Sequence, residues 1–320
     1  MAIKINNNSY NKFYLDGDKV SKIYLNSNLV YTASSGGGDE PEAWEEWEKD
    51  LLTFTALEAT DIGLFATGMT APNCYYRKAT DTGYTKMTTA TTISLGVGEQ
   101  VKFYGGNPYW SRDRSIWTRF TSTGKFNVSG NVMTLLASGG TASVRQRYCF
   151  RRLFAETHVV DASELTLPSR QYDFMFYGML QQCPYLQKLP VMPTPTHPSV
   201  YAYFCNKCPS LQSATLSTGT YSRGYIFQGM FQDCSGLTAV TIPAEDITDG
   251  SAVALLFQRC KSLQTITFSN MTTLTTDHLA SDWFDGVPDT IGTAYVPANR
   301  TYADSRLSLP SGWSVQNLPT

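Results

Sequence analysis

The sequence predicts a mainly β chain made of a small N-terminal β-unit, a β-sandwich domain and a C-terminal solenoid of stacked repeats. Its composition favours strands and turns, because aromatic residues make up 13% of the 320 residues and charged residues only 16%. Short apolar segments separated by turn residues recur through the first half, which is typical of a sandwich. In the second half a motif returns about every 26 residues, and a fixed period of this length indicates a repeat array.

The charge balance and the lack of long apolar segments narrow the classes of protein to which this chain can belong. The formal net charge is −2, so there is no surplus of cations for phosphate contacts, and we expect no nucleic-acid partner. No run of 18 apolar residues occurs, and we expect no insertion into a membrane. The N-terminus is polar and rich in Asn, without the apolar core of a signal peptide, which predicts assembly in the cytoplasm.

Residues 1–35 form the first predicted unit, a small sheet. Apolar segments at 13–15 and 23–25 flank the dipeptide Asp16-Gly17, which is a strong hairpin signal. A sheet of two or three short strands is marginal on its own, so it needs a partner surface. We interpret the unit as an N-terminal β anchor module, with docking onto its own chain as the alternative.

Residues 36–52 connect this unit to the next domain. A Ser- and Gly-rich stretch comes first and is a flexible linker by composition. A short acidic helix is predicted to follow, with Trp44, Trp47 and Leu51 on one face. We expect this face to pack on the neighbouring domain or, alternatively, to dock a partner, and we expect the acidic side chains to be solvated.

Residues 53–148 are predicted to form a β-sandwich-like domain. Strand segments such as 93–95 and 101–103 alternate with Gly- and Asn-containing turns at the spacing of a sandwich. A loop that contains Trp110 and Trp117 is predicted either to fold over the end of a sheet or to contact a ligand.

The last part of the chain, residues 149–320, carries the most informative pattern. A Cys recurs at intervals of 25, 26 and 26 residues, and a Leu follows each Cys three residues later. Alternating apolar residues come next, so each repeat is expected to contribute one short strand to a parallel stack. This pattern predicts a leucine-rich-repeat solenoid with a C-terminal cap. The Cys positions are Cys183, Cys208, Cys234 and Cys260, and the Leu positions are Leu186, Leu211, Leu237 and Leu263.

The row of Cys residues predicts a ladder of small apolar groups inside the stack. We expect Cys208, Cys234 and Cys260 to be buried, reduced and free of metal, with about 5 Å between neighbouring repeats. Side chains that point the same way in a parallel ladder have poor geometry for a disulfide. Cys205 and Cys208 have the spacing of half a zinc site, but no second Cys or His pair lies at ligand spacing, so we expect no metal site.

The repeats resemble a known family. The stretches Phe231–Leu237 (FQDCSGL) and Phe257–Leu263 (FQRCKSL) are similar to the F-x-x-C-x-S-L core of BspA-type leucine-rich repeats. Three further segments resemble proteins of gut Bacteroidales and their phages. They are residues 120–133, which resemble the β-domain that precedes such repeats, residues 293–298, which resemble their closing segment, and residues 22–31, which resemble the N-terminus of phage virion appendage proteins.

This resemblance implies a structural phage virion protein, located in a tail, baseplate or fibre appendage. It implies attachment to other virion proteins through residues 1–35, and a solenoid that binds a glycan or protein of the host surface. Unpaired edges of a small sheet invite a second chain, so we expect a homo-oligomer, with a trimer favoured. We expect no enzymatic activity, no catalytic residues and no cofactor.

Two other functions stay open at this point. A bacterial cell-surface adhesin of the same repeat class is one, but such proteins need an export signal or an early lipoprotein Cys, and the first Cys here is Cys74. A glycan-degrading enzyme is the other, and it needs paired carboxylates across a binding face. Glu245 and Asp246 are adjacent in the sequence and make a poor pair.

The candidate receptor contacts are aromatic, because flat rings pack on sugar faces at low entropic cost. The alternative for each tyrosine is simple packing between repeats. The candidates are Tyr201, Tyr203, Tyr221 and Tyr225 in the repeats, and Trp110 and Trp117 in the sandwich loop.

The break in composition after residue 34 generates a first test. Deletion of residues 1–35 should leave a folded remainder that no longer incorporates into phage particles, because the chain beyond the linker has its own periodic core. Circular dichroism and mass spectrometry of purified particles measure the two parts of this prediction. If the truncated chain still assembles, the anchor lies elsewhere, for example in the segment with Trp44 and Trp47.

Overall fold

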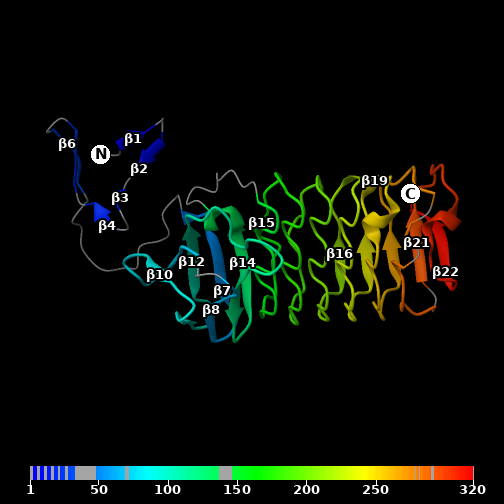
Figure 1. Cartoon of the computed structure of the whole chain (residues 1–320), viewed down its shortest axis with the longest axis horizontal. Coiled ribbons are helices and arrows are strands. Elements are labelled where there is room, and N and C mark those ends of the chain that lie inside the picture. Colours follow the sequence, from blue (N-terminus) through cyan, green and yellow to red (C-terminus); the bar gives the residue numbers. More distant parts are fainter. Residues whose placement is uncertain are drawn as a thin grey trace.

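The computed structural model describes residues 48–68, 72–136, 146–277, 279–280, 282–289 and 292–319, and the backbone of six short strands between residues 3 and 32. These parts of the chain are mainly β (Figure 1). The expectation of a mainly β protein is therefore confirmed. Most of the predicted linker, together with Trp44 and Trp47, lies outside the described residues.

The six N-terminal strands pair as three antiparallel hairpins, β1-β2, β3-β4 and β5-β6. Strands occur at the segments that the sequence predicted around residues 13–15 and 23–25. The strands are β1 (Ile3–Ile5), β2 (Asn8–Tyr10), β3 (Phe13–Leu15), β4 (Asp18–Val20), β5 (Lys22–Leu25) and β6 (Asn28–Thr32).

Two sheets follow in the region predicted to be a sandwich. One has six strands in the order β10-β9-β12-β7-β14-β15, and the other has three in the order β11-β8-β13. The strands are β7 (Leu52–Ala56), β8 (Thr60–Ala66), β9 (Cys74–Lys78), β10 (Thr85–Met87), β11 (Ile93–Leu95), β12 (Gln100–Gly105), β13 (Thr118–Ser122), β14 (Phe126–Asn131) and β15 (Leu165–Thr166); a short 3₁₀ helix, η2 (Val132–Leu135), follows β14.

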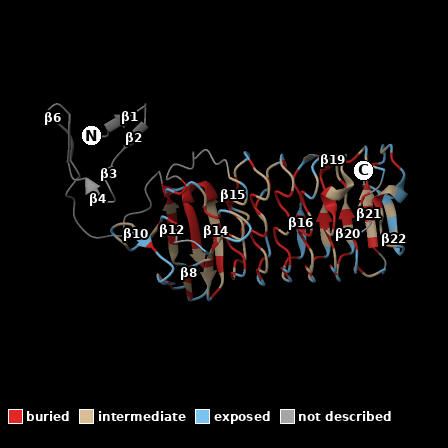
Figure 2. Ribbon diagram, viewed as in Figure 1, coloured by how far each residue is buried: buried red, intermediate tan, exposed pale blue. Residues whose placement is uncertain are grey.

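The two sheets pack against each other through a cluster of phenylalanines. The ring of Phe54 on β7 lies 4.8 Å from those of Phe103 on β12 and Phe120 on β13. All three side chains are fully buried, and such tilted and edge-on ring pairs stabilise a core beyond simple area burial. Figure 2 shows the buried residues running along the interior of this region.

The end of the predicted acidic helix folds differently from the expectation. Leu51, expected on a helix face, instead forms a parallel β-bridge with Asn131, and Leu52 begins β7. Glu48, expected to be solvated, is 1% exposed and accepts hydrogen bonds from Arg77 and Tyr84. A buried carboxylate needs such partners to offset its desolvation. Because Arg77 lies on β9, Glu48 packs as part of the sandwich.

In the second half of the chain, short strands from successive repeats form a parallel sheet in the order β16-β18-β20-β21-β22. Neighbouring strands pair with an offset of 26 residues where Ala214 faces Val240 and Val240 faces Ile266. The strands are β16 (Ser213–Thr215), β18 (Ala239–Thr241), β20 (Thr265–Thr267), β21 (Gly292–Val296) and β22 (Trp313–Asn317); β17 (Gly219–Tyr221) and β19 (Ala244–Ile247) form a second parallel pair, and η3 (Gly250–Val253) and η4 (Asp304–Leu307) are short 3₁₀ helices.

The other side of each repeat is a chain of tight turns, which we call the turn ribbon. In the first repeat Tyr148, Arg152 and Glu156 have positive φ angles of 61°, 56° and 61°, so every fourth residue is left-handed. The amide of each donates to a carbonyl of the next repeat, on Asp173, Tyr177 and Gln181 respectively. Left-handed geometry is costly for residues other than Gly, and these bonds between repeats hold it in place.

The Cys row lies inside the stack, as the sequence predicted. Cys183, Cys208, Cys234 and Cys260 are all fully buried with free thiols. Each thiol donates to a carbonyl of the preceding repeat; for example, the Sγ of Cys208 lies 3.2 Å from the carbonyl oxygen of Leu180. The same relation holds for the other three. The ladder therefore supplies hydrogen bonds between repeats as well as apolar volume.

The sandwich and the repeats share one continuous structure. On one side, β13 reaches the first turn ribbon, where the amide of Phe120 donates to the carbonyl of Leu153. On the other side, β14 pairs in parallel with β15, with Gly130 opposite Leu165. One hydrophobic core runs through both parts, so the limit predicted at residues 148/149 falls inside a shared core.

Burial of the thiols generates a test by pH. Burial raises the pKa of Cys183 to about 11, above the value of about 8.5 expected in the unfolded chain. Below pH 8.5 the thiol is neutral in both states; above it only the unfolded chain ionises, so the free energy of unfolding falls by up to roughly 3 kcal/mol for this residue as pH approaches 11. Urea unfolding at pH 7.5 and 10 should show a smaller loss in Cys183→Ala than in the natural chain. Equal losses would contradict the assignment.

Candidate functional site

The prediction of a receptor contact is wrong for three of the six candidate residues, because their side chains are fully buried. They are Tyr201, Tyr221 and Trp110. The ring of Tyr201 stacks between Phe176 and Phe227 at centroid distances of 5.6 and 5.7 Å. Its hydroxyl donates to the carbonyl of Pro193 and accepts from Gln171. Tyr201 is thus one member of a row of stacked rings inside the repeats, with its polar end satisfied.

Tyr221 and Trp110 are buried for similar reasons. The hydroxyl of Tyr221 donates to the carbonyl of Ser217 at 2.6 Å. Trp110 stacks on Phe120 at 5.3 Å, and its ring nitrogen donates to the carbonyl of Thr118. Both rings fill core positions with satisfied polar ends, so neither can contact a receptor at the surface.

The other three candidates reach the surface. Tyr225 is 49% exposed, while Trp117 and Tyr203 are half-buried. Trp117 and Tyr203 belong to a contiguous group of rings and guanidinium groups, which we call the arginine–aromatic strip. The strip consists of Phe65, Trp117, Arg119, Tyr148, Arg151, Arg152, Phe174, Tyr177 and Tyr203.

The sandwich end of the strip joins β8, β13 and the first turn ribbon. Phe65 and Arg119 are paired residues on β8 and β13, and the guanidinium of Arg119 lies 5.3 Å from the Phe65 ring centroid. Trp117 lies 5.6 Å from Phe65. From the repeat, the guanidinium of Arg152 lies 5.0 Å from the ring of Trp117. The two guanidinium–ring distances lie within the cation–π range. The contact between Arg152 and Trp117 joins the first repeat to the sandwich.

The repeat end of the strip crosses three turn ribbons. Tyr148 and Phe174 stack at 4.8 Å with an angle of 11° between their planes. Arg151 lies 5.0 Å from the ring of Tyr177, and Tyr177 lies 5.4 Å from Tyr203. The ribbon buries most of its residues in each repeat and leaves a few side chains at the surface, so side chains of successive repeats become neighbours.

One glycine shows how closely the rings lie on the ribbon. A Cβ atom built on Gly229 would come within 2.6 Å of the Tyr203 ring, and the φ of this residue is +56°. Gly229 occupies the same position in its repeat as Tyr203 does in the preceding one. The absence of a side chain therefore lets the Tyr203 ring lie flat over the next repeat.

The electrostatics of the strip are dominated by its arginines. Glu156 accepts a hydrogen bond from Arg119 at 2.8 Å and lies 3.9 Å from Arg152. Burial lowers the pKa of Arg119, and burial followed by repulsion from Arg152 lowers the pKa of Arg151. Both shifts indicate cations that are partly withdrawn from water and incompletely balanced.

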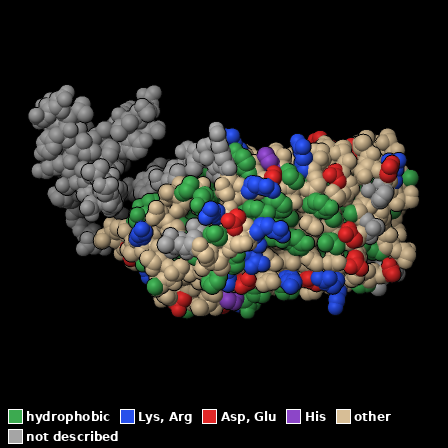
Figure 3. Space-filling view, viewed as in Figure 1, with side chains coloured by type: hydrophobic (Ala, Val, Ile, Leu, Met, Phe, Trp, Pro, Cys, Tyr) green, Lys and Arg blue, Asp and Glu red, His purple; other side chains and the backbone are tan. Residues whose placement is uncertain are grey.

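Charge is also unevenly distributed along the chain. Residues 111–170 contain nine Lys and Arg against four Asp and Glu, whereas residues 241–320 contain four against eight. In Figure 3, Lys and Arg side chains lie among hydrophobic ones in the middle of the visible face, and several acidic side chains lie toward the C-terminal end. The strip thus occupies the basic part of a nearly neutral chain.

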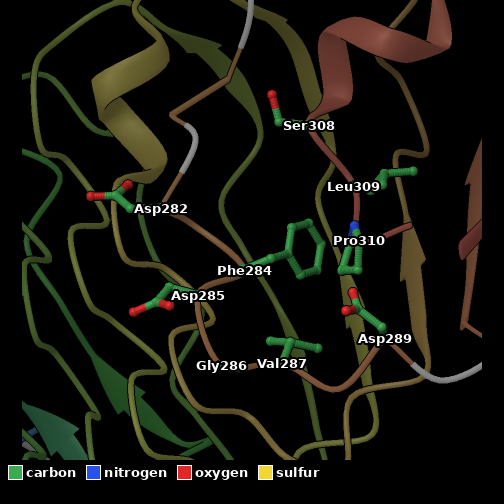
Figure 4. Close-up of a pocket in the computed structure, with 9 residues that line it drawn as sticks. All are labelled: Asp282, Phe284, Asp285, Gly286, Val287, Asp289, Ser308, Leu309 and Pro310. Carbon is green, nitrogen blue, oxygen red and sulfur yellow. The ribbon is translucent and has the colours of Figure 1, made fainter. Parts of the chain in front are cut away.

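An open pocket of about 490 Å³ lies at the C-terminal end (Figure 4). Asp282 and Asp285 point away from the Phe284 ring, while Asp289 lies beside Pro310. The Asp285 carboxylate accepts a hydrogen bond from Gln258, and the Asp282 carboxylate accepts one from the amide of Leu255. Both acids therefore serve contacts with the preceding repeat.

The described residues form neither a cluster of metal ligands nor a membrane-spanning helix. No group of three His, Cys, Asp or Glu side chains there is placed to hold a metal ion. None of the helices in that part of the chain has the length and apolar character needed to cross a bilayer. The His158 ring contacts the hydroxyl of Ser122, and the His197 ring contacts that of Thr196.

Sequence reasoning missed the arginines of the strip. The pair Arg151-Arg152 in the first repeat was a usable signal, because uncompensated adjacent arginines are unusual in a weakly charged chain. Arg119 gave no such signal in the sequence, because its place beside Arg151 and Arg152 depends on the register between β13 and the first repeat. Searches against protein-family models, curated proteins and solved structures found no match to this chain.

Burial of Tyr201 generates a stability test. Tyr201→Ala should reduce the free energy of unfolding by about 3–5 kcal/mol, because it removes a ring from a packed row and leaves a cavity. The matched control is Tyr225→Ala, whose half-exposed ring should cost no more than about 0.5 kcal/mol. Urea denaturation measures both. Equal small effects would show that the ring of Tyr201 is not part of the core.

Proposed function

We propose that this chain is a structural protein of a phage particle that presents a host-binding surface on a leucine-rich-repeat solenoid. The repeat motif and its resemblance to BspA-type repeats support the solenoid. So do the parallel strands offset by 26 residues and the Cys ladder between repeats. In this proposal the solenoid spans residues 149–320, and the sandwich of residues 53–148 precedes it.

The observation that carries the binding role is the arginine–aromatic strip. Tyr, Trp and Arg are the residues that most often dominate binding energy at interfaces. Here Arg152 and Tyr203 lie on turn ribbons and their amides bond to the next repeat, while Trp117 lies in the loop before β13 and its carbonyl accepts from the amide of Thr67. Because this backbone is already held, little ordering is needed when a ligand binds. Trp117 and Tyr203 are the contact residues that we retain from the sequence, together with Tyr225 further along the repeats.

Attachment and assembly complete the proposal. Residues 1–35 join the chain to other virion proteins of a tail, baseplate or fibre, and the chain forms a homo-oligomer, most favourably a trimer. The hairpins in residues 3–32 support this because short strand pairs have unpaired edges that a second chain can extend. Several copies would make weak individual contacts useful together.

Binding to host cells tests the proposal. Fluorescently labelled full-length protein should bind the surface of gut Bacteroidales cells, and Tyr177→Ala should weaken this binding at least fivefold because Tyr177 lies at the centre of the strip. Tyr295→Ala is the matched control, since this half-buried tyrosine lies on β21, on the strand side of the repeats, and it should bind like the natural chain. Equal binding by both variants would contradict the role of the strip.

A further inference from the structure

The cluster of Arg119, Arg151 and Arg152 carries more positive charge than its described neighbours balance. Glu156 is the carboxylate paired with Arg119 and Arg152. Arg151 donates instead to a neutral group, the backbone carbonyl of Arg114. One carboxylate thus stands against three guanidinium groups.

A second acid, Asp113, interacts electrostatically with Arg151 but does not change the sign of this balance. Asp113 accepts hydrogen bonds from the amides of Ser115 and Ile116 and lies 4.0 Å from Arg112. Arg114 adds a further cation beside Arg151, and its charge contributes to the lowered pKa of Arg151. The neighbourhood therefore keeps a net positive charge when these two residues are included.

The same three arginines also have unused hydrogen-bond donors. The Nε atoms of Arg119, Arg151 and Arg152 are shielded from water and have no partner among the described residues. Aromatic rings lie against the guanidinium groups, but a ring face accepts little along the guanidinium edge, where its donors form a planar fork. The side chains of Arg119 and Arg152 remain 15% and 26% exposed, so an anion can reach these groups without entering the shielded Nε positions. An unbalanced, partly desolvated cation favours such an anion.

We propose that this cluster binds the carboxylate or sulfate groups of an acidic polysaccharide, with the neighbouring rings of Trp117 and Tyr177 packing on the sugars. The inference rests on the proposed host-binding function and names its ligand. The fork of a guanidinium matches a carboxylate or sulfate in two parallel hydrogen bonds. The strip extends over the sandwich and three repeats, which suits an extended chain with regularly spaced anions.

An acidic peptide added as a strand is the less suitable ligand. This mode of peptide recognition gains its affinity from backbone pairing with an open strand edge. On the turn ribbons the backbone amides are already hydrogen-bonded, because the amide of Arg152 donates to the carbonyl of Tyr177 and the amide of Tyr203 donates to that of Gln228. A polysaccharide needs only the side chains that the strip provides.

The experiment uses the full-length chain and four immobilised probes: polygalacturonate, dextran sulfate, polyglutamate and neutral dextran. The natural chain should bind the two anionic polysaccharides more tightly than polyglutamate and should not bind neutral dextran, and raising the salt concentration should weaken binding. Arg152→Gln and Arg151→Gln should each weaken binding about tenfold. The control Arg259→Gln removes a charge from the turn ribbon that lies two repeats beyond the strip, and its binding should stay within twofold of the natural chain. Thermal unfolding confirms that each variant is folded.

The opposite results separate this inference from the proposed function. Equal binding to neutral dextran, no effect of either strip variant, or tighter binding to polyglutamate than to polygalacturonate would overturn the ligand assignment. If the natural chain binds host cells while failing to bind the anionic polymers, the host-binding function stands and this inference fails. If it binds the polymers through the strip but not the cells, the inference stands and the proposed host is wrong.

Discussion

The fold of the second half depends on one constraint: every second amide on a turn ribbon finds its partner only on the next repeat, as those of Tyr148, Phe150 and Arg152 do, while the amides between them bond within their own repeat. Buried backbone donors must be bonded, and the left-handed residues at every fourth ribbon position cannot supply a regular helix or strand within one repeat. Phe174 and Gly178, for example, donate to Pro198 and Ala202. A single repeat is therefore unstable alone, and the array needs a partner at each end.

At the N-terminal end the sandwich meets this need. Its strand β13 supplies donors to the first ribbon, and β14 pairs with β15, so both faces of the repeats begin on existing strands. The same junction creates the arginine–aromatic strip. Arg119 and Trp117 come from the sandwich and Arg152 from the first repeat, and the cluster exists because the register of the junction sets them side by side.

The sequence predicted the mainly β class, the buried Cys row and several of the strands, because those features depend on spacing alone. It placed Tyr201 at the surface by mistake. Phe176, Tyr201 and Phe227 each lie seven residues before a Cys of the row. An aromatic residue that recurs at this fixed distance from a buried Cys indicates a second buried row, and this signal was present in the sequence. The strip could not be predicted in the same way. Arg119 and Arg152 are 33 residues apart in different parts of the chain, and only the hydrogen bonds between β13 and the first ribbon bring them together.

The ribbon also explains why Tyr201 and Tyr203, only two residues apart, have opposite environments. Tyr201 lies in the inward row of rings, whereas Tyr203 is a left-handed residue with a φ of 55° whose ring lies over Gly229. Arg152 covers Gly178 in the preceding pair of repeats, so a large side chain in one repeat lies over a glycine in the next. In the described repeats the positions that pack inward are therefore distinct from the positions that reach the surface, and the backbone turns set both.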